Sequence, residues 1–466
     1  MSQLLRLNDG TASSRGVSEE SSSSKFLSFF GHADYSYQGK YNLDFTLRND
    51  ASSRFGKDVR NAKFWSVGAR WNARKENFVK NSSWLDDFSA KISYGTQGNA
   101  AIGDYRHLAL IGTTAQYAEG TSWYIAQPSN RDLTWEKQGL FTVGFNARLF
   151  KLIDFEIEWY NRTTTSMLMA VPYPYTAGIS EMTANIGGLS NSGIDISLGL
   201  DLYKGKDSYL RFNTTFNYNK EEVKELFDAA WDEDLNRYRW ERLSYGYALV
   251  QGQPIMYYAP IFAGIDPADG APTWYVPSDD PDVTTMDPAN VTKKFDEDAL
   301  TQNTGKKMHA PIHGGFSLEG GWKILSFRAD FSYRLGATLL NNDAYFYGNP
   351  VNFLGYNTYK GCSDFWTPTN TDAKWPDWSK GYSMQFDTHL YENANFLRLK
   401  SLQVGINVPN KYIGGKVFDS IKITLTGRNL LTFTKYTGID PEVDNNLTMG
   451  LPGNTKQFLA GIELGF

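Results

Sequence analysis

The chain has 466 residues, of which 15% are aromatic and 21% charged, and its formal net charge is -5. This mild acidity argues against a nucleic-acid-binding protein, which usually has a basic excess, so no nucleic-acid partner is predicted. The single cysteine, Cys362, excludes an internal disulfide. A helical membrane protein is excluded as well, because the longest apolar stretch runs only from Ile255 to Ile265 and a spanning helix needs about 20 apolar residues.

The first 25 residues are rich in serine and lack the apolar core and the small-residue cleavage site of a signal peptide. We expect residues 1–25 to form a flexible segment and residues 26–466 to form the folded part. Such a chain is either cytosolic, already processed or a piece of a longer protein.

From residue 26 onward, apolar and polar residues alternate. Tyr41, Leu43, Phe45 and Leu47, for example, alternate with polar residues. This period of two is typical of a strand with one apolar and one polar face, and no amphipathic helix of useful length is found. We predict about fifteen strands, over residues 26–37, 41–50, 62–74, 85–97, 138–150, 153–165, 190–203, 207–222, 243–250, 255–263, 311–321, 325–338, 395–408, 419–430 and 457–466.

The connections between these strands alternate in length. The short ones are 38–40, 75–84, 151–152, 204–206, 251–254, 322–324 and 409–418, and the long ones are 51–61, 98–137, 166–189, 223–242, 264–310, 339–394 and 431–456. Outer-membrane barrels have short periplasmic turns and long extracellular loops, whereas a large soluble all-β protein, the alternative, has no reason to sort its loops. Aromatic residues near strand ends fit an interfacial belt: Tyr37, Tyr41, Trp71, Trp84, Trp159 and Trp322.

The last predicted strand is amphipathic and ends on Phe466, as is typical of bacterial outer-membrane barrels. Single-chain bacterial barrels have an even number of strands, but fifteen is odd. If the C-terminus lies in the periplasm, the last strand and the strand 26–37 both run toward the periplasm. The sequence therefore predicts a further strand on the N-terminal side of residue 26.

Five motifs follow one another along the chain: Arg48 to Phe55 (RNDASSRF), Ser93 to Asn99 (SYGTQGN), Asp132 to Lys137 (DLTWEK), Phe396 to Leu402 (FLRLKSL) and Gly427 to Glu442 (GRNLLTFTKYTGIDPE). They resemble, in the same order, motifs of the SusC/RagA family of TonB-dependent outer-membrane transporters. Ala51 stands where that family usually has glycine. The resemblance extends over nearly the whole chain.

The resemblance implies an all-β fold, an antiparallel transmembrane β-barrel of 22 strands located in the outer membrane. The fifteen predicted strands would be strands eight to twenty-two. The family places the first seven strands, a plug domain, the TonB box and a signal sequence upstream, and this chain contains none of them. Those remaining N-terminal strands and the plug would come from the same gene or from a separate chain.

The function implied is import of a nutrient, a glycan or an oligopeptide, by the barrel portion of a TonB-dependent transporter. Its partners would be a SusD-like surface lipoprotein, the lipid membrane, the glycan or peptide ligand, and the TonB complex, the last only through the missing N-terminal part. The alternative is an outer-membrane binding or adhesion barrel without energy-coupled transport. No enzymatic activity and no cofactor are predicted.

Three carboxylates, Asp154, Glu156 and Glu158, share one face of the strand 153–165. Side chains two residues apart on a strand are separated by about 7 Å, a spacing that would also suit an inverting glycosidase. We favour the ordinary explanation, a solvated lumen face or ion pairs with an Arg-rich neighbour such as the strand of Arg148. No catalytic residue is predicted.

Two other patterns suggest metal binding only weakly. His309 and His313 flank Pro311, so no helix presents them together. The stretch from Asp266 to Gly270 lacks the alternating ligands of a calcium loop and is interpreted as a turn. No metal site is predicted.

The long loops are the candidates for binding. Loop 339–394 holds thirteen aromatics in 56 residues, too many for an exposed disordered loop. These rings form the loop's own core or pack on neighbouring loops, contact a partner protein, or stack on a bound sugar or peptide. The candidate ligand- or partner-binding residues of the three long loops are Trp231, Tyr238, Trp240, Trp274, Tyr275, Phe365, Trp366, Trp375, Trp378 and Tyr382.

Overall fold

The computed structural model describes residues 21–117, 120–173, 176, 178–179, 181–242, 246–408, 413, 418–442 and 452–465. Of the segment 1–25 predicted to be flexible, residues 1–20 lie outside this part, as does Phe466. None of the helices in the described ranges has the length and apolar character needed to cross a membrane.

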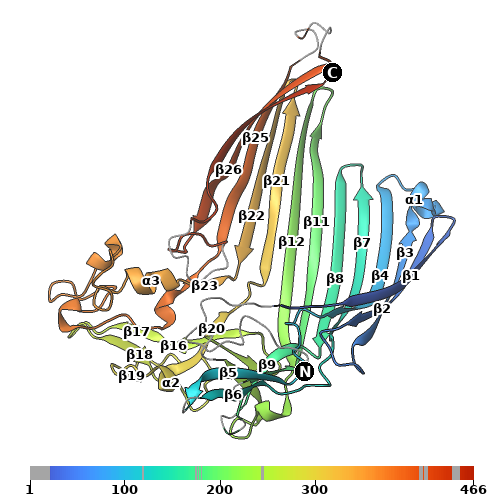
Figure 1. Ribbon diagram of the computed structural model, residues 1–466. Coiled ribbons are helices and arrows are strands. Elements are labelled where there is room, and N and C mark those ends of the chain that lie inside the picture. Colours follow the sequence, from blue (N-terminus) through green and yellow to red (C-terminus); the bar gives the residue numbers. More distant parts are fainter. Residues whose placement is uncertain are drawn as a thin grey trace.

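The main element is a curved sheet of thirteen strands (Figure 1), each paired antiparallel with the next along the chain. The predicted all-β class and the antiparallel pairing are confirmed. The sheet comprises β1 (Phe26–Tyr37), β2 (Tyr41–Ser52), β3 (Asn61–Asn72), β4 (Leu85–Asn99), β7 (Glu136–Leu149), β8 (Ile153–Thr165), β11 (Gly188–Lys204), β12 (Ser208–Glu225), β21 (Ile312–Trp322), β22 (Leu325–Leu335), β25 (Phe396–Val408), β26 (Ser420–Thr434) and β27 (Gln457–Gly465).

The alternation in sequence separates the two faces of this sheet. On β2, Leu43, Phe45 and Leu47 are each about half exposed, so nothing in the described part covers this apolar face. Residues of the opposite parity point to the other face and are polar. A chain with a bare apolar wall and a polar concave face is suited to lipid outside and water inside.

Short and long connections lie at opposite ends of the sheet (Figure 1). The connections at one end are residues 38–40, 73–84, 150–152, 205–207, 323–324 and 409–419, and those at the other end are 53–60, 100–135, 166–187, 226–311, 336–395 and 435–456. The second group is the longer one except at 53–60, whose 8 residues are fewer than the 12 of 73–84 and the 11 of 409–419. At the first short turn, Gln38 and Gly39 both have positive φ, as a tight hairpin turn of type I′ requires. The predicted sorting of the connections is therefore present.

The remaining elements lie within the connections. The short connection after β3 contains η3 (Ala73–Lys75) and α1 (Asn77–Lys80). The long connections contain β5 (Leu110–Tyr117), β6 (Gly120–Gln127), β9 (Leu168–Pro172), β10 (Glu181–Asn185), η5 (Asp228–Ala230), β13 (Trp231–Asp232), β14 (Arg237–Arg242), β15 (Tyr247–Val250), β16 (Met256–Pro260), β17 (Phe262–Ile265), β18 (Pro272–Tyr275), β19 (Val291–Thr292), α2 (Glu297–Leu300), β20 (Thr301–Lys307), β23 (Thr338–Leu340), α3 (Asn342–Tyr347), η7 (Lys360–Ser363), η8 (Trp378–Lys380), η9 (Thr388–Leu390) and β24 (Tyr391–Asn393).

The predicted number of wall strands is wrong for the part of the chain that the structure describes, where the sheet has thirteen strands and not about fifteen. Segments 243–250 and 255–263 contribute β15 and β16, which pair in a separate five-stranded sheet of order β13-β14-β15-β16-β20. They are short, and Ala248, Leu249 and Val250 are all buried. Burial on both faces gives an apolar run that sequence alone cannot distinguish from a wall strand.

Three clusters of buried apolar side chains lie at the end with the long connections, and Ala73 and Val79 are buried separately in the short connection after β3. One cluster joins the connections next to β3, and the other two lie within the connections that follow β12 and β22. Their buried members are Phe55, Ala62, Phe64, Leu133 and Trp135; Val223, Leu226, Ala230, Trp240 and Leu249; and Trp375, Met384 and Leu390. The long connections are therefore packed structures with their own cores.

Candidate functional site

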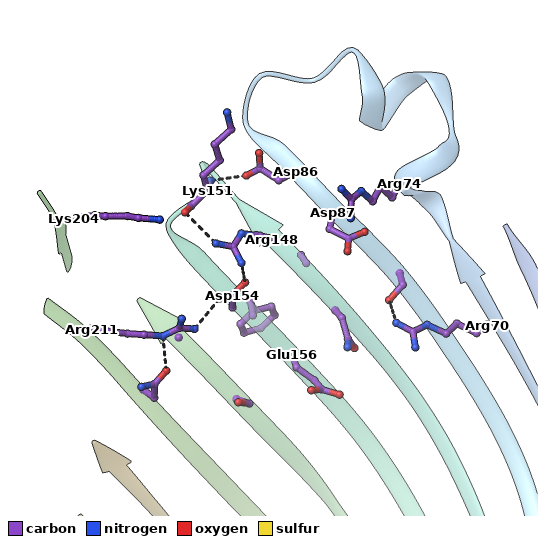
Figure 2. Close-up of a pocket in the computed structure, with 17 residues that line it drawn as sticks. Arg70, Arg74, Asp86, Asp87, Arg148, Lys151, Asp154, Glu156, Lys204 and Arg211 are labelled. Carbon is purple, nitrogen blue, oxygen red and sulfur yellow. Dashed lines mark hydrogen bonds and ion pairs between the residues drawn. The ribbon is translucent and has the colours of Figure 1, made fainter. Parts of the chain in front are cut away.

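A charged cavity of about 730 Å³ lies on the concave face near the short turns (Figure 2). It is lined by side chains of β3, β4, β7, β8, β11 and β12, because alternate residues of each strand point to the same side. Its charged side chains are Arg70, Arg74, Asp86, Asp87, Arg148, Lys151, Asp154, Glu156, Lys204 and Arg211.

Asp154 is the centre of this cluster. Its carboxylate accepts hydrogen bonds from Arg148 Nη1 at 3.2 Å and from Arg211 Nη2 at 2.9 Å. One strand position further along, Lys91 Nζ lies 3.1 Å from Glu156 Oε1 and also pairs with Glu158. The structure thus confirms that the three carboxylates share a face and that Asp154 pairs with Arg148.

Sequence reasoning missed Arg211 and Lys91 as partners of these carboxylates. The alternation predicts that each points to the concave face, but the strand registers that bring Arg211 within reach of Asp154, and Lys91 within reach of Glu156 and Glu158, are not visible in the sequence. Arg74 and Lys204 also line the cavity, and the side chain of neither has a hydrogen-bond or ion-pair partner among the described residues. This end of the concave face therefore offers basic groups to an external partner.

Asp154 and Glu156 are paired with cations at 2.9–3.2 Å, so their negative charges are compensated by neighbouring strands of the sheet. A hydrated, charged surface of this size suits a polar polypeptide surface or a hydrated solute. Among the described residues, no group of three metal-ligating side chains is present.

Two of the sequence motifs meet at the opposite, long-connection end. Phe55 and Leu133 are fully buried and Trp135 is 2% exposed. The ring of Trp135 lies 5.3 Å from that of Phe55, and its Nε1 donates a 2.8 Å hydrogen bond to the Arg60 carbonyl. The packing of these motif residues holds the connections that follow β2 and β4 against the thirteen-stranded sheet, which we call the wall.

The last two motifs meet in the same way. Arg398 on β25 is 3% exposed, donates to Glu442 at 2.8 Å and to Thr432 at 3.0 Å, and also pairs with Asp440. The backbone amides of Glu442 and Asn454 donate to Asp440. The loop after β26 is therefore held to the wall by one buried guanidinium.

The two longest connections contact each other directly. Trp274 Nε1 donates to Asp387 Oδ2 at 2.7 Å, and the Phe262 amide donates to Thr388 Oγ1 at 3.0 Å. Trp366 Nε1 donates to the Pro267 carbonyl at 3.1 Å. We call this junction, residues 262–275 against 364–391, the loop clamp.

The ten predicted loop residues are mostly part of these packed loops. Trp240, Trp274, Trp366 and Trp375 are buried, Trp231 is 43% exposed, and Tyr238, Tyr275, Phe365, Trp378 and Tyr382 are intermediate. Trp231 and Tyr238 face each other with ring centroids 4.9 Å apart. The structure thus brings these residues together mainly as loop core, and their contact with a ligand or partner stays a prediction.

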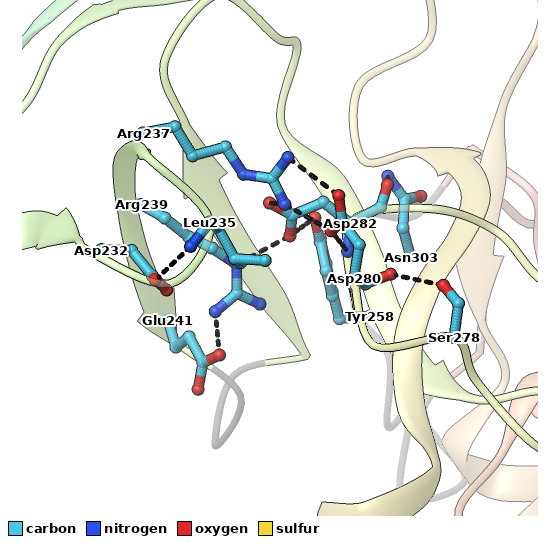
Figure 3. A network of polar contacts seen from close by, with 10 residues as sticks. All are labelled: Asp232, Leu235, Arg237, Arg239, Glu241, Tyr258, Ser278, Asp280, Asp282 and Asn303. Atoms are coloured by element: carbon cyan, nitrogen blue, oxygen red, sulfur yellow. Dashed lines mark hydrogen bonds and ion pairs between the residues drawn. The ribbon is translucent and has the colours of Figure 1, made fainter.

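A buried ion-pair network stabilises the connection between β12 and β21 (Figure 3). Asp282, whose side chain is 1% exposed, accepts from Arg239 Nε and from the Tyr258 hydroxyl, both at 2.7 Å. Arg237 Nη2 lies 2.7 Å from the second carboxylate oxygen. Burial raises the pKa of Tyr258, so its hydroxyl stays protonated and donates to Asp282.

The loop clamp contains two buried titratable groups with opposite shifts. Burial raises the pKa of Asp387 from 3.8 to about 7 and lowers that of His389 from 6.5 to about 4. The stabilisation of the folded state by Asp387 is fully present below pH 3.8 and is lost as the pH rises toward 7. The stabilisation by His389 is fully present above pH 6.5 and is lost as the pH falls toward 4.

We therefore expect the stability of the loop clamp to change little between pH 4 and 6.5, because the two effects oppose each other. In Asp387→Asn only the histidine effect remains, so stability should fall with falling pH by about 1.4 kcal/mol per pH unit. In His389→Phe stability should instead rise by a similar amount. Urea midpoints from tryptophan fluorescence at each pH test this; parallel profiles of both variants would contradict it.

Three comparisons with known proteins bear on this architecture. The family model described as "TonB dependent receptor-like, beta-barrel" matches residues 4–260. The chain is 27% identical to TonB-dependent receptor P3 of Formosa agariphila, over 95% of this chain and 46% of that protein. It is 28% identical to TonB-dependent receptor SusC of Bacteroides thetaiotaomicron, over 94% of this chain and 44% of that protein.

Among solved structures, the chain resembles one from the RagAB peptide transporter with a TM-score of 0.84 and 38% identity, covering 95% of this chain and 48% of the other. A chain of the RagAB peptide importer in the open-open state is similar at a TM-score of 0.83 and 37% identity, covering 95% and 47%. The chain thus spans about half the length of the relatives that it matches.

Proposed function

Because the chain belongs to the TonB-dependent receptor-like β-barrel family, we propose that residues 26–466 form part of the wall and mouth of an energy-coupled nutrient importer. It is a multi-pass β-barrel chain of the outer membrane, with the concave face of the sheet toward the lumen. The observation that carries the proposal is the match to a chain of the RagAB peptide transporter over 95% of the residues at 38% identity.

In this proposal the charged cavity near the short turns receives the plug, which lies in the part of the protein outside this chain. The basic side chains without partners, Arg74 and Lys204, would contact acidic groups of the plug. At the other end, the packed long connections form the mouth, where a SusD-like lipoprotein closes over a glycan or oligopeptide. TonB acts only through the N-terminal part.

The strand count supports such an arrangement. Thirteen strands leave β1 and β27 running in the same direction, each with one sheet neighbour in the described part. An antiparallel closed wall then needs an odd number of further strands. A barrel of twenty-two strands would supply nine of them, two more than the seven expected from sequence.

Two measurements test the function. We expect the chain to co-purify from native outer membranes with a lipoprotein and with polypeptide carrying the plug, as shown by intact-mass spectrometry. We also expect cells to take up labelled oligopeptide or oligosaccharide only when TonB is present. Binding without TonB-dependent uptake, and without a lipoprotein, would favour an adhesion barrel instead.

A further inference from the structure

A second cavity, of about 620 Å³, opens where three long connections meet, among them the two of the loop clamp. Its walls come from β17, from residues 344–390, from β24 and from residues 435–437 after β26. The volume lies within the 300–1,000 Å³ typical of ligand pockets. It is separate from the charged cavity of the concave face, with which it shares no lining residue.

The aromatic walls of this cavity form a continuous stack. The ring of His389 lies 4.6 Å from Phe262 and 5.0 Å from Trp375, with interplanar angles of 24° and 17°. Trp375 in turn stacks on Trp378 at 5.9 Å and 30°. His389 and Trp375 therefore each stack with two other rings, and Trp375 is only 5% exposed.

A covered ring face cannot bind a sugar, because a sugar uses its C–H bonds against the electron-rich face of an aromatic ring. Phe262, Trp375 and His389 of this stack line the cavity, together with the apolar side chains of Ile265, Met384 and Leu390. Such a surface is suited to an apolar side chain. Among the aromatic residues that line the cavity, Tyr359 is the one that is substantially exposed, at 44%.

The charged groups of the cavity are not equivalent. The Glu392 carboxylate already has hydrogen-bond partners, since its oxygens accept from Asn341 Nδ2 at 2.8 Å and from the Thr437 amide at 2.6 Å. Asp364 accepts from Asn370 Nδ2 at 3.2 Å. Lys374 and Lys435, in contrast, have no hydrogen-bond or ion-pair partner within the described residues, so the cavity offers ammonium donors that lack an acceptor.

We propose that this cavity binds the C-terminal residue of an oligopeptide that ends in an apolar side chain. The side chain lies against Ile265 and Phe262, which are partly exposed, and the terminal carboxylate accepts from Lys374 and Lys435. This inference rests on the proposed import function and adds a substrate class to it. A glycan is disfavoured because His389 and Trp375 are stacked with other rings, which leaves Tyr359 as the one strongly exposed ring among the lining residues.

The probe is N-acetyl-alanyl-alanyl-leucine, compared with the same peptide as its C-terminal amide, bound to the full-length transporter in detergent. We expect the free acid to bind at least tenfold more tightly than the amide, because hydrogen bonds to a charged group are the stronger ones. In the double variant Lys374→Met, Lys435→Met the preference should disappear. Lys360→Met, an exposed lysine of the same connection outside the cavity, is the matched control.

Equal binding of acid and amide, or an acid preference that survives the double variant, would overturn the inference. Tighter binding of a glucuronate-containing disaccharide, lost in the same double variant, would assign the cavity to acidic glycans and would overturn it too. Uptake in cells separates this from the function itself. TonB-dependent uptake without any lysine dependence refutes the cavity alone, whereas lysine-dependent binding without uptake refutes the import function.

Discussion

Replacing Asp282 by alanine should destabilise the connection between β12 and β21 by about 3–5 kcal/mol, the usual cost of breaking a buried ion pair. The carboxylate is 1% exposed and satisfies Arg239 and Tyr258 together. Without it, the guanidinium of Arg239, whose side chain is 4% exposed, stays buried with Glu241 as its remaining partner. A buried guanidinium that has lost one of its two carboxylate partners, more than the lost contact itself, sets the size of the effect.

The measurement is amide hydrogen exchange in residues 276–290, the segment that Asp282 fixes to β14 and β16. Protection factors there should fall at least 100-fold, since each 1.4 kcal/mol is a factor of ten. Asp279→Ala is the matched control, because Asp279 is exposed and has no partner within the described ranges; it should change stability by less than about 0.5 kcal/mol. Similar protection in both variants would refute the role given to Asp282.

Trp135→Ala should cost about 3–5 kcal/mol, as expected for removing a large buried aromatic side chain. Trp135 contacts the rings of Phe26, Phe55 and Phe64 at centroid distances of 5.3–5.7 Å. Its removal leaves a cavity at the point where two connections meet the wall. The Arg60 carbonyl also loses its indole donor.

The urea midpoint of the protein in detergent, followed by circular dichroism, gives this loss directly. Trp135→Phe should recover most of the packing but not the hydrogen bond, and so should lie between the alanine variant and the wild type. Trp123→Ala is the control, since Trp123 is 66% exposed. A midpoint for Trp135→Ala equal to that of Trp123→Ala would show that the cluster does not hold the connections.

The wall strands were predictable from sequence because the alternation of apolar and polar residues is contained within each single strand. A lipid-facing strand must be apolar on every second residue, and β2 or β8 shows this without reference to any other strand. Parity also placed Asp154, Glu156 and Glu158 on one face. The pairing of Asp154 with Arg211 was not predictable, because it depends on the registers of β8, β11 and β12, which no single strand encodes.

The loops were less predictable for a related reason. Composition showed that the aromatics of residues 339–394 must be packed, but not against what. Trp274 and Trp366 are buried because the two longest connections contact each other across more than ninety positions of sequence. The buried strands β15 and β16 lack alternation, so they were mistaken for wall strands.

The alternation of short and long connections also sets the order in which the sheet can form. The hairpin β1–β2 closes over 3 residues, whereas β12 and β21 must meet across 86. Closing the longer loop costs about 3 kcal/mol more in chain entropy. We therefore expect folding to start from hairpins nucleated at the short turns, which then join side by side, with the long connections at the mouth of the barrel ordered last.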